Sequence, residues 1–242
     1  MTAWVKTNQS CLNCGSSRGL ALAVDHEHCF KCGYHRNYNG FYISHAVSKD
    51  LLWTGYLPPT TNKIPINYRI WLEKYFTPDQ YKQLGLLWSD EYNRLVFPVR
   101  SRDGTLTCYQ MRSITHDPKW ITVSPEYPWG HKYPWISEWG AESYVITEDI
   151  LSALKVSFIH PTVSILGSSV NTAFCNFLAT LTNDFIIWLD GDSAGIQGTN
   201  KLLTKLSLSS NIKVIRTPYD PKEYAINRIK EIIEGVTLPD DM

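Results

Sequence analysis

The strongest constraint on the fold is an apolar run that ends in two closely spaced carboxylates. Phe185–Leu189 is long enough for a buried strand, and Asp190-Gly191-Asp192 follows it directly. An uninterrupted apolar run of this length is typical of a central strand in a parallel sheet. In extended chain Asp190 and Asp192 point the same way, so both can face one ligand. Such oxygen ligands suit Mg²⁺. The alternative is a strand that ends in a solvated turn.

Two further acidic positions favour the metal interpretation. Glu148 directly follows the predicted strand Ser143–Thr147, and Asp220 lies four residues past the predicted strand Ile212–Arg216. The carboxyl ends of parallel strands meet at one edge of a sheet, and ligands bind there. We therefore predict that these two carboxylates converge with those of the Asp-Gly-Asp segment.

From residue 141 onward the chain alternates between strand and helix patterns, which predicts a parallel sheet with right-handed crossovers. The predicted strands are Ser143–Thr147, Thr162–Leu166, Phe185–Leu189 and Ile212–Arg216. The predicted helices are about Ile150–Phe158, Asn171–Leu181, Ala194–Leu206 and Lys222–Glu234.

Four cysteines near the N-terminus have the spacing of a zinc ribbon. Cys11 and Cys14 form one C-x-x-C pair, and Cys29 and Cys32 form the second, fourteen residues further on. Four thiolates complete a tetrahedral Zn²⁺ site, so the metal is expected to be structural. A segment this small has little core, and zinc would supply most of its folding free energy. His26 lies nearby, and we interpret it as a surface group that faces a nucleic-acid base.

The sequence of the central part of the chain predicts a linker followed by a small α+β unit. Residues 41–66 are rich in aromatic residues, Pro and Thr, which is typical of an extended linker. Helices are predicted at Asn67–Phe76 and from Thr77 to Leu84. Leu95–Arg100 and Leu106–Arg112 flank an Asp-Gly turn, a strong hairpin signal. Lys119–Val123 is predicted to add a strand.

Basic and aromatic side chains in this unit are candidates for nucleic-acid contacts. Arg112 and Lys119 lie on strands, and we predict that they bind nucleotide or template, because cations beside a carboxylate–Mg²⁺ site neutralise phosphate charge. Arg100 and Arg102 are interpreted as solvated turn residues. The aromatic residues between 127 and 139 either stack bases or pack a subdomain junction, and we favour packing.

The charge balance is neutral overall, with 23 basic and 23 acidic residues. The C-terminal third is net acidic and the rest mildly basic, so any DNA affinity should be modest and salt-sensitive. There is no signal-peptide pattern and no apolar run long enough to span a bilayer. We expect a soluble, cytoplasmic protein without a membrane partner.

The order of the acidic groups resembles the TOPRIM domain of primases, topoisomerases and related nucleases. The matching residues are Glu148, Asp190-Gly191-Asp192 and the segment Asp220–Tyr224. That family usually has Gly after the glutamate and often Asp four positions after it, whereas this chain has Asp149 and Ser152. Asp149 either supplies the missing acidic group or caps the following helix, and we favour the cap.

The whole chain resembles the primase half of phage T7-like primase–helicases. This resemblance is carried by the four cysteines, the hairpin with Gln110-Met111-Arg112, and the acidic segments just named. It implies a multidomain α/β protein. The expected parts are a zinc-binding ribbon (1–40), a linker (41–66), a small basic α+β subdomain (67–140) and a TOPRIM domain with a parallel sheet (141–242).

The resemblance implies a DNA primase that synthesises short RNA primers on single-stranded DNA from ribonucleoside triphosphates. Asp190, Asp192 and Asp220 would hold one or two Mg²⁺, and Glu148 would serve as a metal ligand or a general base. No G-x-x-x-x-G-K-[ST] motif occurs, so we expect a stand-alone primase, or a helicase on a separate polypeptide or on a longer parent chain. The expected setting is the cytoplasm of a phage-infected bacterium, with a DNA polymerase as a further partner.

Two other functions stay open on the sequence. One is a TOPRIM nuclease, in which the same metals direct water at a phosphodiester; the zinc ribbon argues against it. The other is a non-catalytic DNA-binding adaptor, which the departures at Asp149 and Ser152 favour.

Overall fold

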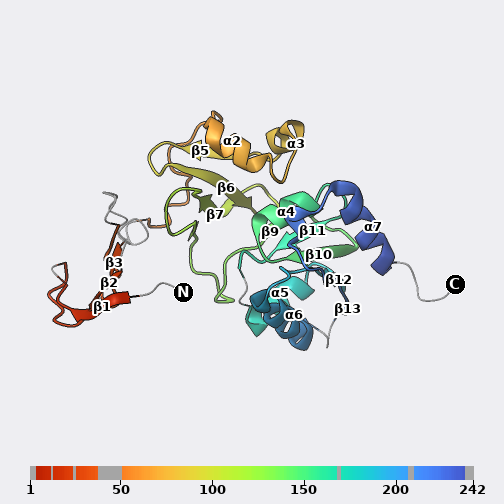
Figure 1. The fold of residues 1–242 in the computed structure, drawn as a ribbon. Helices are drawn as coiled ribbons and strands as arrows, with labels where there is room; N and C mark the ends of the chain where they lie inside the picture. Colours follow the sequence, from red (N-terminus) through yellow and green to blue (C-terminus); the bar gives the residue numbers. More distant parts are fainter. Residues whose placement is uncertain are drawn as a thin grey trace. The chain divides into compact units, whose positions relative to one another are not determined.

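The computed structural model describes residues 4–11, 13–23, 26–37, 51–167, 170–206 and 210–237. The chain forms two compact units, one of residues 1–52 with 113–121 and the other of residues 53–112 with 122–242. Figure 1 colours the chain from red at the N-terminus to blue at the C-terminus. Within the described ranges, every helix is too short or too polar to cross a lipid bilayer.

The first unit contains a four-stranded antiparallel sheet. Its strands pair in sequence order and are β1 (Trp4–Gln9), β2 (Leu20–Ala23), β3 (His26–Cys29) and β4 (His35–Asn37). Its buried cluster consists of Cys11, Leu20 and Cys29, with Cys32 and Tyr34 packed against it. Three of these five residues are cysteines, so apolar burial alone stabilises the ribbon little.

The second unit begins with two helices, and its strands β5 to β7 belong to an antiparallel sheet of order β5-β6-β7-β8. These elements are α2 (Ile66–Leu72), α3 (Pro78–Gln83), β5 (Leu87–Ser89), β6 (Arg94–Arg100), β7 (Leu106–Arg112) and β8 (Trp120–Val123). Thr77 and Gln80 form a capping box at the start of α3. The β6–β7 turn contains Gly104 at φ +84°, a conformation that favours glycine.

Part of the predicted linker belongs to the second unit. Residues 41–50 of that linker lie outside the described residues. In the rest of the linker, the Trp53 ring lies 6.2 Å from that of Tyr109. Thr61 forms a β-bridge with Trp88 through two backbone hydrogen bonds. The domain boundaries at residues 40, 66 and 140 stay a prediction.

The C-terminal sheet has the order β13-β12-β10-β11-β9. Four strands are parallel, and only β9 runs antiparallel, beside β11. The strands are β9 (Trp135–Ile136), β10 (Ser143–Thr147), β11 (Thr162–Ser164), β12 (Asp184–Ile187) and β13 (Asn211–Val214). The helices are α4 (Ile150–Val156), α5 (Thr172–Ala179), α6 (Ser193–Leu206), the 3₁₀ turn η1 (Pro221–Glu223) and α7 (Ile226–Thr237). The predicted strand–helix alternation and the α/β fold class are confirmed.

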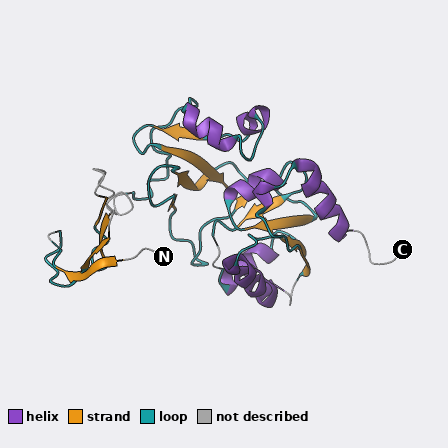
Figure 2. Cartoon of the chain, viewed as in Figure 1, coloured by secondary structure: helices purple, strands orange, loops and turns teal. Residues whose placement is uncertain are grey.

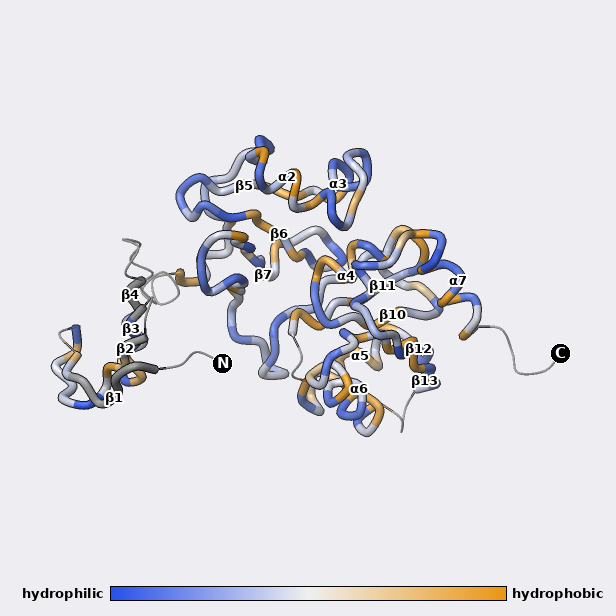
Figure 3. Tube along the Cα trace, in the orientation of Figure 1, coloured by the Kyte–Doolittle hydropathy of each residue, from blue (hydrophilic) through white to orange (hydrophobic). Residues whose placement is uncertain are grey.

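Helices cover both faces of this sheet, as the coloured cartoon in Figure 2 shows. Because side chains alternate along a strand, Tyr144 and Ile146 face the core that contains residues of α5 and α6. Val145 faces the opposite core, with residues of α4 and α7. Hydrophobic positions, orange in Figure 3, gather in these central strands and the helices against them. Burial on both faces explains why these strands read as continuous apolar runs.

The last predicted helix, Lys222–Glu234, is divided in the structure. Tyr224 has an extended backbone, with φ −84° and ψ 147°, and it separates η1 from α7. Its ring lies 5.9 Å from that of the buried Trp188. Packing of Tyr224 on the sheet therefore overrides the local helical pattern.

Candidate metal centre and active site

The four predicted zinc ligands come together in the first unit. Cys11, Cys14, Cys29 and Cys32 have their sulfur atoms within 4.8 Å of one another. The Sγ atoms of Cys11 and Cys32 are 3.8 Å apart, and those of Cys14 and Cys29 are 3.9 Å apart. Tetrahedral coordination with Zn–S bonds of about 2.3 Å requires S–S separations of about 3.8 Å. The thiols therefore have the spacing of a structural zinc site.

Two glycine turns place these thiols. Gly15 and Gly33 follow the two C-x-x-C pairs at φ +70° and +73°. Their N–H groups donate to the carbonyls of Cys11 and Cys29, at 2.9 and 2.8 Å. Gly19 is constrained by space, since a Cβ there would lie 2.9 Å from Cys29 Sγ. Turn geometry and close packing thus both require glycine around the site.

The thiols have unequal proton affinities. Hydrogen bonding to the Tyr34 backbone is the largest influence on Cys32 and lowers its pKa to about 6. The Ser16 backbone acts in the same direction on Cys14, but hydrogen bonds with the other thiols and desolvation raise its pKa to about 11. Zinc binds thiolates, so loading this site releases protons.

Adjacent parallel strands place the acidic residues at one edge of the C-terminal sheet. Glu148 follows β10, Asp190 follows β12, and Asp220 follows β13. Ile146 of β10 is in register with Ile187 of β12, so the two strands end at a similar level. Long-range charge effects couple Glu148 with Asp192 and Asp220, which places these carboxylates in one electrostatic cluster.

The Asp-Gly-Asp turn depends on two glycines. A Cβ on Gly191 would lie 2.5 Å from the Thr217 carbonyl oxygen, and one on Gly195 would overlap the Asp190 carbonyl. Asp192 Oδ1 accepts a hydrogen bond of 2.8 Å from Gly195 N at the start of α6. One carboxylate oxygen of Asp192 thus helps to begin the helix.

Asp149 caps α4, as predicted. Its Oδ1 accepts hydrogen bonds from the N–H groups of Leu151 and Ser152, at 2.8 and 3.1 Å. Ser152 Oγ donates to Asp149 Oδ2 at 2.8 Å, so the two residues that depart from the family pattern contact each other. Asp149 also faces the acidic cluster, where Lys222 Nζ lies 2.9 Å from its Oδ2. It is therefore both a helix cap and a member of the cluster.

Lys222 is a site residue that was not predicted from the sequence. Its Nζ lies 2.6 Å from Asp220 Oδ2, 2.9 Å from Asp149 Oδ2 and 3.9 Å from Asp190 Oδ2. Burial by itself lowers the pKa of Lys222, but the charges of Asp149 and Asp190 and hydrogen bonds to the carboxylates outweigh it and raise the pKa. The sequence feature that could have indicated Lys222 is its position inside the segment Asp220–Tyr224, which was matched to the TOPRIM pattern.

Two carboxylates in the cluster hold protons more tightly than usual. Burial, followed by the negative charge of Asp149, raises the pKa of Asp190 to about 8, although Lys222 opposes this. Burial and the charges of Asp192, Asp149 and Asp220 also raise the pKa of Glu148. A divalent cation would remove this penalty, because it stabilises the charged forms.

Unpartnered buried oxygens supply the test of whether a metal fits here. Glu148 Oε2 and Asp190 Oδ1 are buried and have no hydrogen-bond partner. Buried carboxylate oxygens are normally satisfied, and hard oxygen donors suit Mg²⁺. Within the described ranges, only the four cysteines bring three or more potential ligand atoms within 4.8 Å of one another. The carboxylates thus fit a divalent cation in donor type but are spread more widely than a closed protein cage.

The predicted nucleic-acid contacts are distributed over both units. Arg112 ends β7 in the second unit, and its guanidinium carbon lies 5.4 Å from the centre of the Trp71 ring. Lys119 is exposed and belongs to the first unit, as does His26, which begins β3. The side chain of His26 lies outside the described residues. The binding roles of all three stay predictions.

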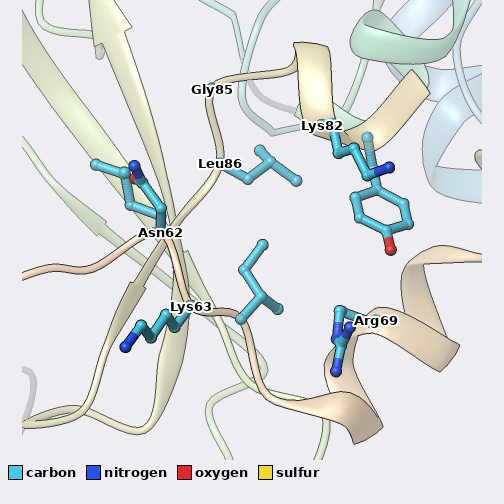
Figure 4. Close-up of a pocket in the computed structure, with 9 residues that line it drawn as sticks. Asn62, Lys63, Arg69, Lys82, Gly85 and Leu86 are labelled. Atoms are coloured by element: carbon cyan, nitrogen blue, oxygen red, sulfur yellow. The ribbon is translucent and has the colours of Figure 1, made fainter. Parts of the chain in front are cut away.

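Two cavities in the second unit carry cations that sequence reasoning did not select. A cavity of about 680 Å³ is lined by Lys132, His131 and Tyr127 among others. Lys132 Nζ donates to the Leu166 carbonyl at 3.0 Å, and burial lowers its pKa. A second cavity of about 550 Å³, shown in Figure 4, is lined by residues that include Lys63, Arg69 and Lys82.

The aromatic residues between 127 and 139 pack together, in agreement with the favoured interpretation. The rings of Tyr127 and Trp129 stack at 4.9 Å, and Trp129 stacks on Phe177 of α5 at 4.7 Å. Trp129 and Trp139 both pack against the larger core of the C-terminal sheet. These rings therefore attach the preceding loop to the sheet.

Comparison with known proteins identifies the C-terminal part first. Residues 141–225 match the Toprim-like domain family. The DNA primase of Staphylococcus aureus (strain COL) is 27% identical over 146 residues, which is 54% of this chain and 24% of that protein. The DNA primase of Staphylococcus epidermidis is 25% identical over a region of the same length. This chain thus spans about a quarter of the length of these relatives.

Solved structures extend the likeness to nearly the whole chain. The zinc-binding and RNA polymerase domains of Aquifex aeolicus primase superpose with a TM-score of 0.58 at 16% identity, over 90% of this chain and 75% of that one. The primase fragment of the bacteriophage T7 primase–helicase gives 0.54 at 20% identity, over 98% and 100%. The resemblance to T7-like primases is confirmed in the fold: the chain has a segment that matches the Toprim-like family, a four-cysteine cluster and the fold of the primase fragment.

Proposed function

We propose that this protein is a DNA primase, which synthesises short RNA primers on a single-stranded DNA template. The observation that carries the proposal is the convergence of Glu148, Asp190 and Asp220 at the carboxyl edge of a Toprim sheet. The same chain carries a zinc-type cysteine cluster. The primase names of the relatives and the fold of the solved primases support the proposal.

The carboxylates have distinct tasks in the proposed reaction. Asp190 and Asp192 would hold the divalent ion, which would supply charge neutralisation at the triphosphate. Glu148, whose pKa is raised by burial, would serve as a further metal ligand or as the base that accepts a proton from the attacking 3′-hydroxyl. Arg112 and Lys119 would supply positive charge for phosphate or template. The ribbon, loaded with Zn²⁺ by its four thiolates, binds template and nascent primer.

The proposed partners are single-stranded DNA, ribonucleoside triphosphates, a replicative helicase and a DNA polymerase, in a phage-infected bacterial cell. One solved structure with a similar fold is a primase catalytic domain bound to single-stranded DNA, with a TM-score of 0.50. Two weakly binding units on one chain gain from effective concentration, so neither needs high affinity alone.

One assay tests the proposal against its alternatives. The full zinc-loaded chain is incubated with single-stranded template, four labelled ribonucleotides and Mg²⁺, beside a matched Asp190→Asn variant. We expect short RNA from the native chain and none from the variant. Template fragments would identify a nuclease, and the absence of both products would identify a DNA-binding adaptor.

A further inference from the structure

Lys222 divides the acidic cluster into two halves. One half consists of Asp149 Oδ2 and Asp220 Oδ2, which lie 2.9 and 2.6 Å from the ammonium group. The other half consists of Asp190 Oδ1 and Glu148 Oε2, which are buried and have no hydrogen-bond partner. Asp190 belongs to both, because its Oδ2 lies 3.9 Å from Lys222 Nζ.

The ammonium group is partly buried among carboxylates. The Lys222 side chain is only 15% exposed, and its neighbours Asp149 and Asp190 are 21% and 20% exposed. Its partners come from three segments, since Asp149 begins α4, Asp190 follows β12, and Asp220 begins η1. Lys222 thus contacts carboxylates from three chain segments, which is the position that a bound metal ion would take in such a cluster.

A divalent ion and this ammonium group exclude each other at the shared oxygens. Mg²⁺ binds oxygen at about 2.1 Å, so an ion on Asp220 Oδ2 would lie at most about 4.7 Å from Lys222 Nζ. Two cations at that separation in a partly buried site repel each other strongly. Glu148 Oε2 and Asp190 Oδ1 have no hydrogen-bond partner, so an ion bound to these two oxygens would not have to displace the ammonium group from them.

We propose that Lys222 is a built-in cation that replaces a second divalent ion, so that the site holds a single metal. Glu148, Asp190 and Asp192 then bind that ion, while Asp149 and Asp220 are neutralised by Lys222. This inference rests on the proposed metal-dependent function. It makes Lys222 the residue that determines how many metal ions the site holds.

The test counts the Mn²⁺ ions bound to the full zinc-loaded chain by electron paramagnetic resonance, in a buffer that contains no other divalent ion. We expect one Mn²⁺ on the native chain and two on Lys222→Met, which keeps the aliphatic stem but removes the charge. Lys230→Met is the matched control, because Lys230 is exposed and pairs only with Glu234 within its own helix in the described contacts. The control should bind one ion.

A second measurement covers the case in which Lys222→Met folds poorly. Without divalent ions the variant leaves three carboxylates facing one another, so its thermal midpoint should fall and Mn²⁺ should restore it more than it stabilises the native chain. Lys222→Asn should behave in the same way. Two ions on the native chain, or one ion on both chains, would overturn the inference while leaving the primase proposal intact. No Mn²⁺ on the native chain would overturn both.

Discussion

Trp188 Nε1 donates a hydrogen bond of 2.8 Å to the hydroxyl of Thr217, twenty-nine residues further along the chain. The indole is fully buried between the sheet and α7. Thr217 Oγ1 in turn donates to the Tyr219 carbonyl at 2.9 Å. This connection ties the end of β12, which leads to Asp190, to the loop that carries Asp220.

Trp188→Phe should therefore loosen the acidic cluster as well as the core. The variant keeps an aromatic ring but loses the donor and leaves a cavity, which together cost about 2–4 kcal/mol of unfolding free energy. Thr217→Val should reproduce only the hydrogen-bond part, about 1 kcal/mol. Urea unfolding of both variants checks this. Equal costs for the two would mean that the indole contributes no packing.

Two variants of Asp149 separate its contribution as a helix cap from the contribution of its charge. Asp149→Asn keeps the acceptor for Leu151 and Ser152 but loses the ion pair with Lys222, whereas Asp149→Ala loses both. We expect the alanine variant to be less stable than the asparagine variant by about 1 kcal/mol. Chemical denaturation measures the difference. Identical stabilities would show that the cap contributes nothing.

Metal-free stability should fall as the pH rises through the range in which Asp190 titrates. The folded-state pKa of Asp190 is raised from 3.8 to about 8, so the folded chain binds its proton more tightly than the unfolded chain does. The stabilising contribution is complete below pH 4 and is lost as the pH approaches 8. Unfolding free energies of native protein and Asp190→Asn should diverge over this window. Parallel curves would contradict the assignment.

The zinc ribbon should unfold independently of the second unit. Cys14→Ser or Cys29→Ser removes one of four thiolates, and we expect loss of the metal and of ordered structure in residues 1–40. Metal analysis and amide hydrogen exchange over both units measure these effects. Full zinc retention in a Cys14/Cys29 double variant, or loss of protection in the Toprim sheet, would count against this organisation.

Glu148→Gln tests the catalytic role of the glutamate. The amide keeps the shape but cannot hold metal or accept a proton, so primer yield should fall by orders of magnitude. Binding of single-stranded DNA should stay within a few-fold, because the group contacts metal rather than template. A parallel loss of binding and synthesis would instead assign Glu148 a DNA-contacting or structural role.

Local patterns in the sequence were sufficient for the arrangement of the C-terminal sheet. The mainly apolar runs at 143–147 and 185–189 predicted β10 and β12 because strands buried on both faces consist mostly of apolar residues. Parallel pairing then brings the residues after each strand to one edge, which is why Glu148, Asp190 and Asp220 were predicted together. The cysteine spacing predicted the thiol cluster in the same way, since each C-x-x-C pair occupies a single turn.

Only the tertiary structure decided which of these groups contact one another. Lys222 and Asp149 are 73 residues apart, and no local period relates them. Their contact depends on the close packing of α4 and η1 and on the extended backbone of Tyr224 beside Trp188. Periodicity encodes which face of an element is buried, whereas the direction of a polar side chain is determined by long-range packing. The carboxylates that can bind a metal could therefore be predicted from the sequence. The position of the Lys222 ammonium group among them could not.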